Sequence, residues 1–141
     1  MGKVARALVA IVALIVAACD RDTDRRRLVG VWTSVGPAYS GFSADTMIFS
    51  ADGTIENVTH EYELKGRWRG SRLLRWDTVS RRRSVDTGSW QLTEGDRGAT
   101  LLCMTDPRRR DTGCSTVTIT DSLLLYTLGG TPIVTFTRLR Q

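Results

Sequence analysis

Three cysteines and one histidine are the side chains best suited to covalent or metal chemistry in this 141-residue chain: Cys19, Cys103, Cys114 and His60. A zinc site needs three or four ligands of the Cys, His or carboxylate type, and one histidine beside two cysteines that can pair does not supply them. The sequence also lacks the Gly-x-Ser-x-Gly turn that would expose a serine nucleophile. We therefore expect no metal, no cofactor, no catalytic residue and no enzyme activity.

Cys19 ends an apolar N-terminal segment. After a basic start, residues 7–18 contain only Ala, Val, Ile and Leu. Twelve apolar residues are too few to span a bilayer, which needs about 20, but they suit the apolar part of an export signal. The last four residues before the polar segment, Val16 to Cys19, resemble the bacterial lipobox, in which the signal is cut before a cysteine whose thiol is acylated. The alternatives are an ordinary secretory signal and a short buried helix.

The lipobox resemblance implies a signal peptide over residues 1–18, cleavage between Ala18 and Cys19, and a lipid anchor on Cys19. The mature chain would then lie on a lipid bilayer of the bacterial cell envelope, facing the periplasm, and the sequence leaves inner and outer membrane open. Its formal charge falls from +5 to +3, because Lys3 and Arg6 leave with the signal. That modest charge, in this compartment, argues against a nucleic-acid partner.

Cys103 and Cys114 then remain as an even pair in an oxidising compartment. They lie in consecutive expected strands, on either side of a loop that contains Pro107 and Arg108–Arg110. We predict a disulfide that closes a loop of about a dozen residues and stabilises the fold by about 3 kcal/mol. The alternative is two unpaired buried thiols.

The segments that contain Cys103, Cys114 and His60 are expected to be strands. The hydrophobic content of 41% is too high for a disordered chain. We interpret the polar segment over residues 19–27 as the lipidated cysteine and a solvated tether. Beyond it, β-branched and aromatic runs alternate with Gly, Asp, Ser and Pro clusters, without a helical apolar period. The expected strands cover residues 28–33, 46–49, 72–79, 85–92, 99–104, 114–119, 123–128 and 132–139. Period-two alternation from Val58 to Trp68 predicts one long strand within residues 54–69, and the alternative is that residues 67–69 form a separate strand.

The segments between the expected strands are too short to contain crossover helices, so we expect the fold class to be all-β. We predict an antiparallel meander of about 8–10 strands over residues 28–141. Such a meander usually removes its exposed edges by closing into a barrel, and a β-sandwich is the alternative.

Several landmarks together resemble the small bacterial lipocalin-like domain lipoproteins. They are a Gly-x-Trp motif, an F-x-x-D-G-T hairpin and three later strand segments, at Gly30–Trp32, Phe49–Thr54, Gly88–Trp90, Asp121–Leu125 and Phe136–Arg138. The resemblance implies a lipocalin-like barrel in which the first-strand tryptophan, Trp32, plugs one end. An arginine of the last strand, Arg138 or Arg140, would pack on the face of that ring. The alternative is an ordinary core tryptophan and a solvated arginine.

A barrel of this kind either fills its interior or encloses a ligand. His60, Tyr62 and Trp68 share one parity of a long expected strand, and with Trp90 they are candidates for lining a ligand cavity. We expect a small apolar ligand or an envelope component to bind there. The alternative is a protein-interaction module, such as a periplasmic enzyme inhibitor or assembly accessory. A packed interior with a protruding loop from Val35 to Ala44 would favour that alternative.

Arginine outnumbers lysine eighteen to two, and three triplets stand out: Arg25–Arg27, Arg81–Arg83 and Arg108–Arg110. The second and third are expected in turns of the meander. If these turns lie at the anchored end, the triplets would face anionic lipid headgroups. The alternative is that they are solvated turns.

Overall fold

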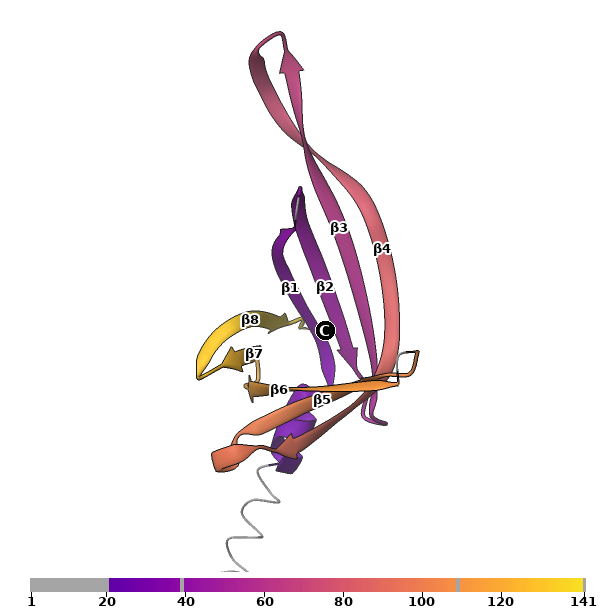
Figure 1. Ribbon diagram of the computed structural model, residues 1–141, viewed down its shortest axis with the longest axis vertical. Helices are drawn as coiled ribbons and strands as arrows, with labels where there is room; N and C mark the ends of the chain where they lie inside the picture. The colour runs from indigo at the N-terminus through magenta and orange to yellow at the C-terminus, as the bar shows by residue number, and fades with distance from the viewer. Residues whose placement is uncertain (1–20, 39, 109, 141) are drawn as a thin grey trace, which may run out of the picture.

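The protein is an antiparallel β-barrel in which each strand pairs with the next and β8 pairs with β1. The computed structural model describes residues 21–38, 40–108 and 110–140 (Figure 1). Its strands, with one 3-10 turn, η1 (Asp96–Gly98), are β1 (Gly30–Ala38), β2 (Gly41–Phe49), β3 (Thr54–Arg69), β4 (Arg72–Glu94), β5 (Thr100–Asp106), β6 (Asp111–Ile119), β7 (Leu123–Leu128) and β8 (Thr131–Arg138). The predicted all-β meander and its closure are confirmed, and the β-sandwich is excluded.

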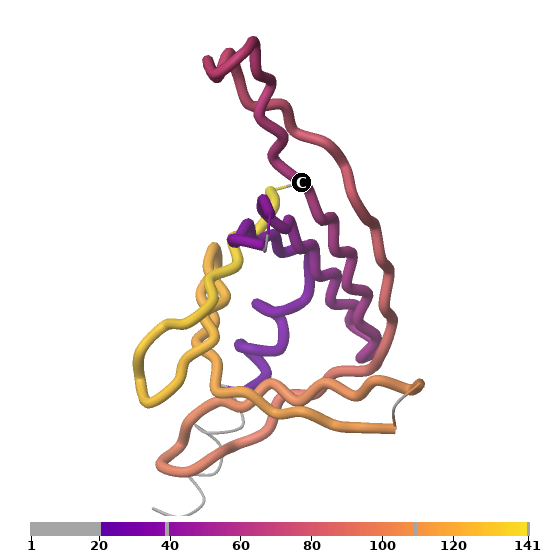
Figure 2. The backbone as a smooth tube through the Cα atoms, turned by 45° about the horizontal axis from the view of Figure 1, so that its top comes forward, coloured from indigo at the N-terminus to yellow at the C-terminus, as the bar shows by residue number. Residues whose placement is uncertain are grey.

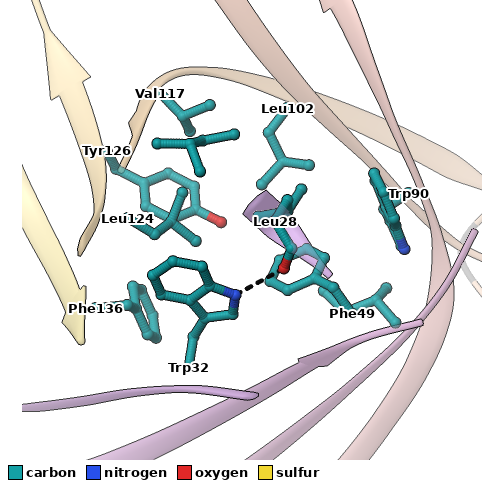
Figure 3. Close-up of a cluster of buried hydrophobic side chains, with 11 residues drawn as sticks. Leu28, Trp32, Phe49, Trp90, Leu102, Val117, Leu124, Tyr126 and Phe136 are labelled. Carbon is teal, nitrogen blue, oxygen red and sulfur yellow. Dashed lines mark hydrogen bonds between the residues drawn. The ribbon is translucent and has the colours of Figure 1, made fainter. Parts of the chain in front are cut away.

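The buried core lies at one end of the barrel. Alternate residues of each strand face inward, and those near this end are large and apolar (Figure 3). The cluster comprises Leu28, Trp32, Phe49, Ile55, Trp90, Leu102, Val117, Ile119, Leu124, Tyr126 and Phe136. Trp32 is fully buried, and its indole N–H donates a hydrogen bond of 2.7 Å to the Leu28 carbonyl, so the buried ring leaves no unsatisfied donor.

The segment interpreted as a solvated tether is instead helical over residues 21–28. Leu28 is completely buried in the core, and the guanidinium of Arg25 lies 5.2 Å from the centre of the Trp90 ring. The helix therefore packs on the closed end of the barrel. Its sequence has no apolar stripe because a single leucine and an arginine stacked on an aromatic ring make these contacts, and local periodicity does not reveal them.

The turn between β2 and β3 shows why the Asp-Gly-Thr motif folds locally. Asp52 Oδ1 accepts hydrogen bonds from the Thr54 hydroxyl at 2.7 Å and from its backbone N–H at 2.9 Å. These bonds, the hydroxyl first, lower the pKa of Asp52. Gly53 has φ +90°, a conformation that side chains disfavour.

Two expected loops are strand instead. The residues from Val35 to Ala44 belong mostly to β1 and β2, which pair from Gly30 opposite Phe49 through to Ala38 opposite Gly41. The loop predicted there is wrong, because Gly, Pro and Ser near a hairpin end resemble an irregular loop.

Arg81–Arg83, predicted as a break between two strands, lies within β4. The register pairs Arg83 with His60 and Arg82 with Glu61, and it shifts between Glu61 and Tyr62. A run of arginines is compatible with a strand here because these side chains are exposed. The triplet therefore does not lie in a turn, and the expected grouping of three arginine triplets at the anchored end is wrong.

The outer parts of β3 and β4 form a two-stranded ribbon that extends beyond the barrel. Pairing between β2 and β3 ends at Glu63, whereas β3 and β4 continue to pair as far as Arg69 and Arg72. Figures 1 and 2 show this ribbon projecting away from the other strands, on the side opposite the N-terminal helix.

The predicted disulfide is confirmed: Cys103 of β5 and Cys114 of β6 are directly paired in register and bonded. Among the residues that the structure describes, no helix is both long and apolar enough to cross a membrane.

Candidate functional site

A hollow of about 410 Å³ lies at the opposite, open half of the barrel interior. Its lining residues come from β2 to β6 and are mostly of the inward parity. They are Met47, Ile55, Asn57, Asp86, Thr87, Gly88, Met104, Thr105, Asp106, Asp111 and Gly113. The interior thus changes from a packed apolar core to a hollow with polar walls.

The floor of the hollow is apolar. Ile55 belongs to the buried core, and Met47 and Met104 pack against that core from the side of the hollow. The Tyr126 hydroxyl contacts Met47 Sδ at 3.8 Å, and burial raises the pKa of Tyr126 to about 12. Flexible methionine side chains adapt to ligands of different shape, so this floor suits the apolar part of a small molecule.

Asn57 supplies the polar feature of the wall. Its side-chain oxygen, Oδ1, is buried and has no hydrogen-bond partner among the described residues. An unsatisfied buried acceptor costs about 1–3 kcal/mol. A bound molecule that donates a hydrogen bond to this oxygen would recover that free energy.

The rim carries carboxylates. Asp86 Oδ1 lies 3.8 Å from Arg108 Nη1, and both side chains are largely exposed. Asp106 Oδ1 accepts a 2.8 Å hydrogen bond from the Arg108 backbone N–H at the start of the β5–β6 turn, and Asp111 follows at the end of that turn. Three carboxylates at the rim, two of them in contact with Arg108, favour a ligand head that donates hydrogen bonds.

A second hollow, of about 540 Å³, lies on the outer face of the same strands. Its walls include Ile48, Thr54, Glu56 and Ser89, which alternate with the inward residues. Although this hollow is larger, its walls contain no buried side-chain atom without a partner among the described residues. We therefore take the inner hollow as the candidate site.

None of the four residues predicted to line a cavity lines the inner hollow. Trp90 belongs to the packed core, edge-on to Phe49 with ring centroids 5.7 Å apart. Trp68 is 58% exposed on the ribbon. His60, Tyr62 and Trp68 follow the outward parity of β3, whereas the opposite parity faces the hollow.

His60 and Tyr62 lie on the outer face of β3, three and five residues beyond the inward-facing Asn57. Tyr62 stacks on Phe42 with centroids 4.9 Å apart. Arg83 Nε lies 3.1 Å from His60 Nε2. Since a guanidinium only donates, His60 accepts at Nε2 and donates its Nδ1 proton toward the Tyr62 oxygen, 3.3 Å away.

The pair Trp32 and Arg138 lies at the seam where the barrel closes. The two residues are opposite each other in the short β1–β8 ladder. The Arg138 guanidinium carbon lies 5.2 Å from the centre of the Trp32 ring, and Arg138 Nη2 donates to the Val29 carbonyl. Arg138 therefore joins the last strand to the first.

The sequence signal for the inner hollow was weak but present. Asn57 shares its parity with Ile55, so a core-facing asparagine was visible in the pattern. The proximity of β3 to the β5–β6 hairpin arises because β4 pairs with β3 up to Ser89 and with β5 from Ser89 onward. The cleavage and lipidation residues, Ala18 and Cys19, lie outside the described residues.

In the part of the chain that is described, no group of three or more His, Cys, Asp or Glu side chains is arranged to hold a metal ion.

Comparison of the chain with protein-family models, with curated proteins and with solved structures finds no match.

Proposed function

We propose that the protein is a membrane-anchored lipoprotein of the bacterial cell envelope that binds a small ligand in the open half of its barrel. The observation that carries the proposal is the inner hollow, with the buried and unpartnered Asn57 Oδ1 in its wall. Barrels of eight strands have room for one small ligand. The ligand would have an apolar body, against Met47 and Met104, and a head that donates hydrogen bonds to Asn57.

The lipid anchor on Cys19 rests on the lipobox resemblance alone. It would join the closed end of the barrel to a periplasm-facing leaflet, since the helix over residues 21–28 packs at that end. A protruding loop from Val35 to Ala44 would have favoured the alternative function, a protein-interaction module, but those residues belong mostly to paired strands.

Native mass spectrometry of the protein, released gently from its own membranes, tests ligand binding. Gly113 lines the hollow, and a Cβ added there meets no atom within 4 Å. Gly113→Trp should therefore fill the hollow without disturbing the strand. The matched control is Thr118→Trp, an exposed position on the other face of the same strand.

We expect a co-purifying small molecule on the wild type and on Thr118→Trp, and its loss from Gly113→Trp. A wild-type protein that carries no such molecule, or an equal load on both variants, contradicts the proposal.

A further inference from the structure

We propose that the ribbon formed by the outer parts of β3 and β4 docks onto an anionic phospholipid bilayer. The ribbon, as defined here, runs from Leu64 to Trp76. It takes no part in the core or in the inner hollow. About six residues of β3 extend past the last β2 pair, at Glu63, which corresponds to about 20 Å of strand.

One face of the ribbon is apolar and exposed. Gly66 is opposite Trp76 in register, and a Cβ added at Gly66 would meet Trp68 Nε1 at 2.7 Å and Leu73 Cδ1 at 3.1 Å. These three large side chains therefore share one face with Gly66. Trp68 and Trp76 are 58% and 60% exposed, an unusual state for tryptophan in a protein with a buried core.

The other face is cationic. It carries five basic residues and no acidic residue within the ribbon: Lys65, Arg67, Arg69, Arg72 and Arg75. The nearest carboxylate, Asp77, is bound by Arg67 Nε and Arg75 Nε at 2.9 Å each. Glu63 Oε2 lies 3.7 Å from Lys65 Nζ, and both arginine side chains remain 61% exposed, so these two carboxylates neutralise only part of this charge.

This combination matches the interface of an anionic bilayer. Tryptophan concentrates at the level of the lipid headgroups. Arginine side chains reach from an apolar surface back to phosphates, with which they form paired hydrogen bonds. The charge of the ribbon opposes pairing with a second copy of itself. We therefore assign the exposed face to lipid rather than to a partner ribbon.

Binding to vesicles tests the proposal without the lipid anchor. The chain from Asp20 to Gln141 is suitable because every residue of the buried core lies between Leu28 and Phe136, and its circular dichroism and thermal unfolding check that each variant is folded. The chain is sedimented with vesicles of phosphatidylcholine alone and with vesicles that also contain phosphatidylglycerol. We expect binding to the anionic vesicles only, and a decrease with added salt.

Two ribbon variants separate the two faces. Each basic residue near an anionic surface strengthens binding about fivefold, so Arg69→Gln with Arg72→Gln should weaken binding by about twentyfold or more. Trp68→Ser with Trp76→Ser should weaken it by at least about tenfold, because two apolar rings leave the interface.

Matched controls lie elsewhere on the surface. Leu128→Ser with Ile133→Ser removes apolar side chains that are 73% and 61% exposed on the β7–β8 hairpin. Arg26→Gln with Arg108→Gln removes two exposed charges outside the ribbon. Both controls should bind anionic vesicles within about twofold of the unchanged chain.

Three results would overturn the proposal. One is vesicle binding that is the same for the ribbon variants and the controls. Another is binding to a single-stranded oligonucleotide with no binding to vesicles. The third is a dimer in sedimentation that the Trp68→Ser, Trp76→Ser variant abolishes, since the exposed face would then be covered by a second copy.

Discussion

Tyr126 connects the packed core to the floor of the inner hollow. Its ring lies 5.8 Å from that of Phe136, and its hydroxyl reaches Met47. Burial raises its pKa to about 12, whereas an exposed tyrosine has a pKa of about 10. The folded state therefore retains the proton over a pH range in which the unfolded chain loses it.

This difference predicts a loss of stability at alkaline pH. Below pH 10 both states are protonated and the residue adds no pH dependence. Between about pH 10 and 12 only the unfolded state ionises, so the free energy of unfolding should fall by about 3 kcal/mol in total. Urea denaturation at stepped pH measures this fall. Tyr126→Phe should abolish this fall in the free energy of unfolding, while Tyr62→Phe, on the outer face, should retain it. An equal fall in the wild type and in Tyr126→Phe would show that another group causes it.

Among the elements, β4 changes its partner strand and makes a close backbone contact with β5. It pairs with β3 through Ser89 and with β5 from Ser89 onward, so the strand changes partner beside Gly88. A Cβ at Gly88 would lie 2.4 Å from the backbone oxygen of Thr105. Backbone atoms cannot move aside as a flexible side chain does, and β4 and β5 approach closely only because this residue is glycine.

Gly88→Ala should therefore destabilise the barrel by about 2–3 kcal/mol, in the range of other overpacked sites. Chemical denaturation measures the change. Gly113→Ala is the matched control on β6, because a Cβ there meets nothing within 4 Å, and its stability should change by less than about 1 kcal/mol. Equal effects of the two substitutions would mean that β5 can move away from β4.

The β5–β6 hairpin holds the rim of the hollow and is closed by the disulfide, whose cysteines are 11 residues apart. Replacing both cysteines with alanine should lower the free energy of unfolding by about 3 kcal/mol, because the unfolded chain regains the entropy of that loop. Denaturation of the double variant and of the reduced wild type should give matching midpoints. A double variant as stable as the oxidised protein would contradict this account.

Individual elements show how much of the fold the sequence predicts. Period-two alternation from Val58 to Trp68 predicted one long strand, which is β3 (Thr54–Arg69) in the structure, and the cysteine count predicted the disulfide. The continuity of β4 through Arg81–Arg83 was not predictable in this way, since local composition does not distinguish an exposed arginine-rich strand from a turn. The inner hollow was not predicted either. The inward parity of Asn57 is a local pattern, but its position near Asp106 and Asp111 arises from the pairing of β4 with both β3 and β5.

At the scale of the whole molecule, the barrel is closed by a short seam. Only Trp32 and Thr33 of β1 pair in register with β8, and the backbone N–H of Leu139 donates to the Val31 carbonyl at 2.9 Å just beyond them. The contacts of Arg138 with the Trp32 ring and the Val29 carbonyl support this seam. The closed end thus depends on side chains, and the open end keeps the hollow accessible.

The two proposed membrane contacts lie at opposite ends of the molecule. The helix over residues 21–28 packs at the closed end, while the ribbon projects from the other side (Figure 1). Only Asp20 lies between Cys19 and this helix, so Cys19 is at most about 7 Å of chain from the first helical residue. An acyl anchor on Cys19 would therefore hold the closed end at one leaflet and direct the ribbon away from it.

This arrangement predicts that the acylated protein joins two lipid surfaces. Added to anionic vesicles, it should cause clustering, which light scattering measures. The acylated Arg69→Gln, Arg72→Gln variant should bind vesicles without clustering them, and so should the unacylated chain, because each retains one membrane contact. The mass of the purified protein separates the two proposals: an unacylated Cys19 removes the anchor but leaves ribbon binding intact. Clustering by the acylated ribbon variant at the wild-type level would instead show that the ribbon does not reach a second surface.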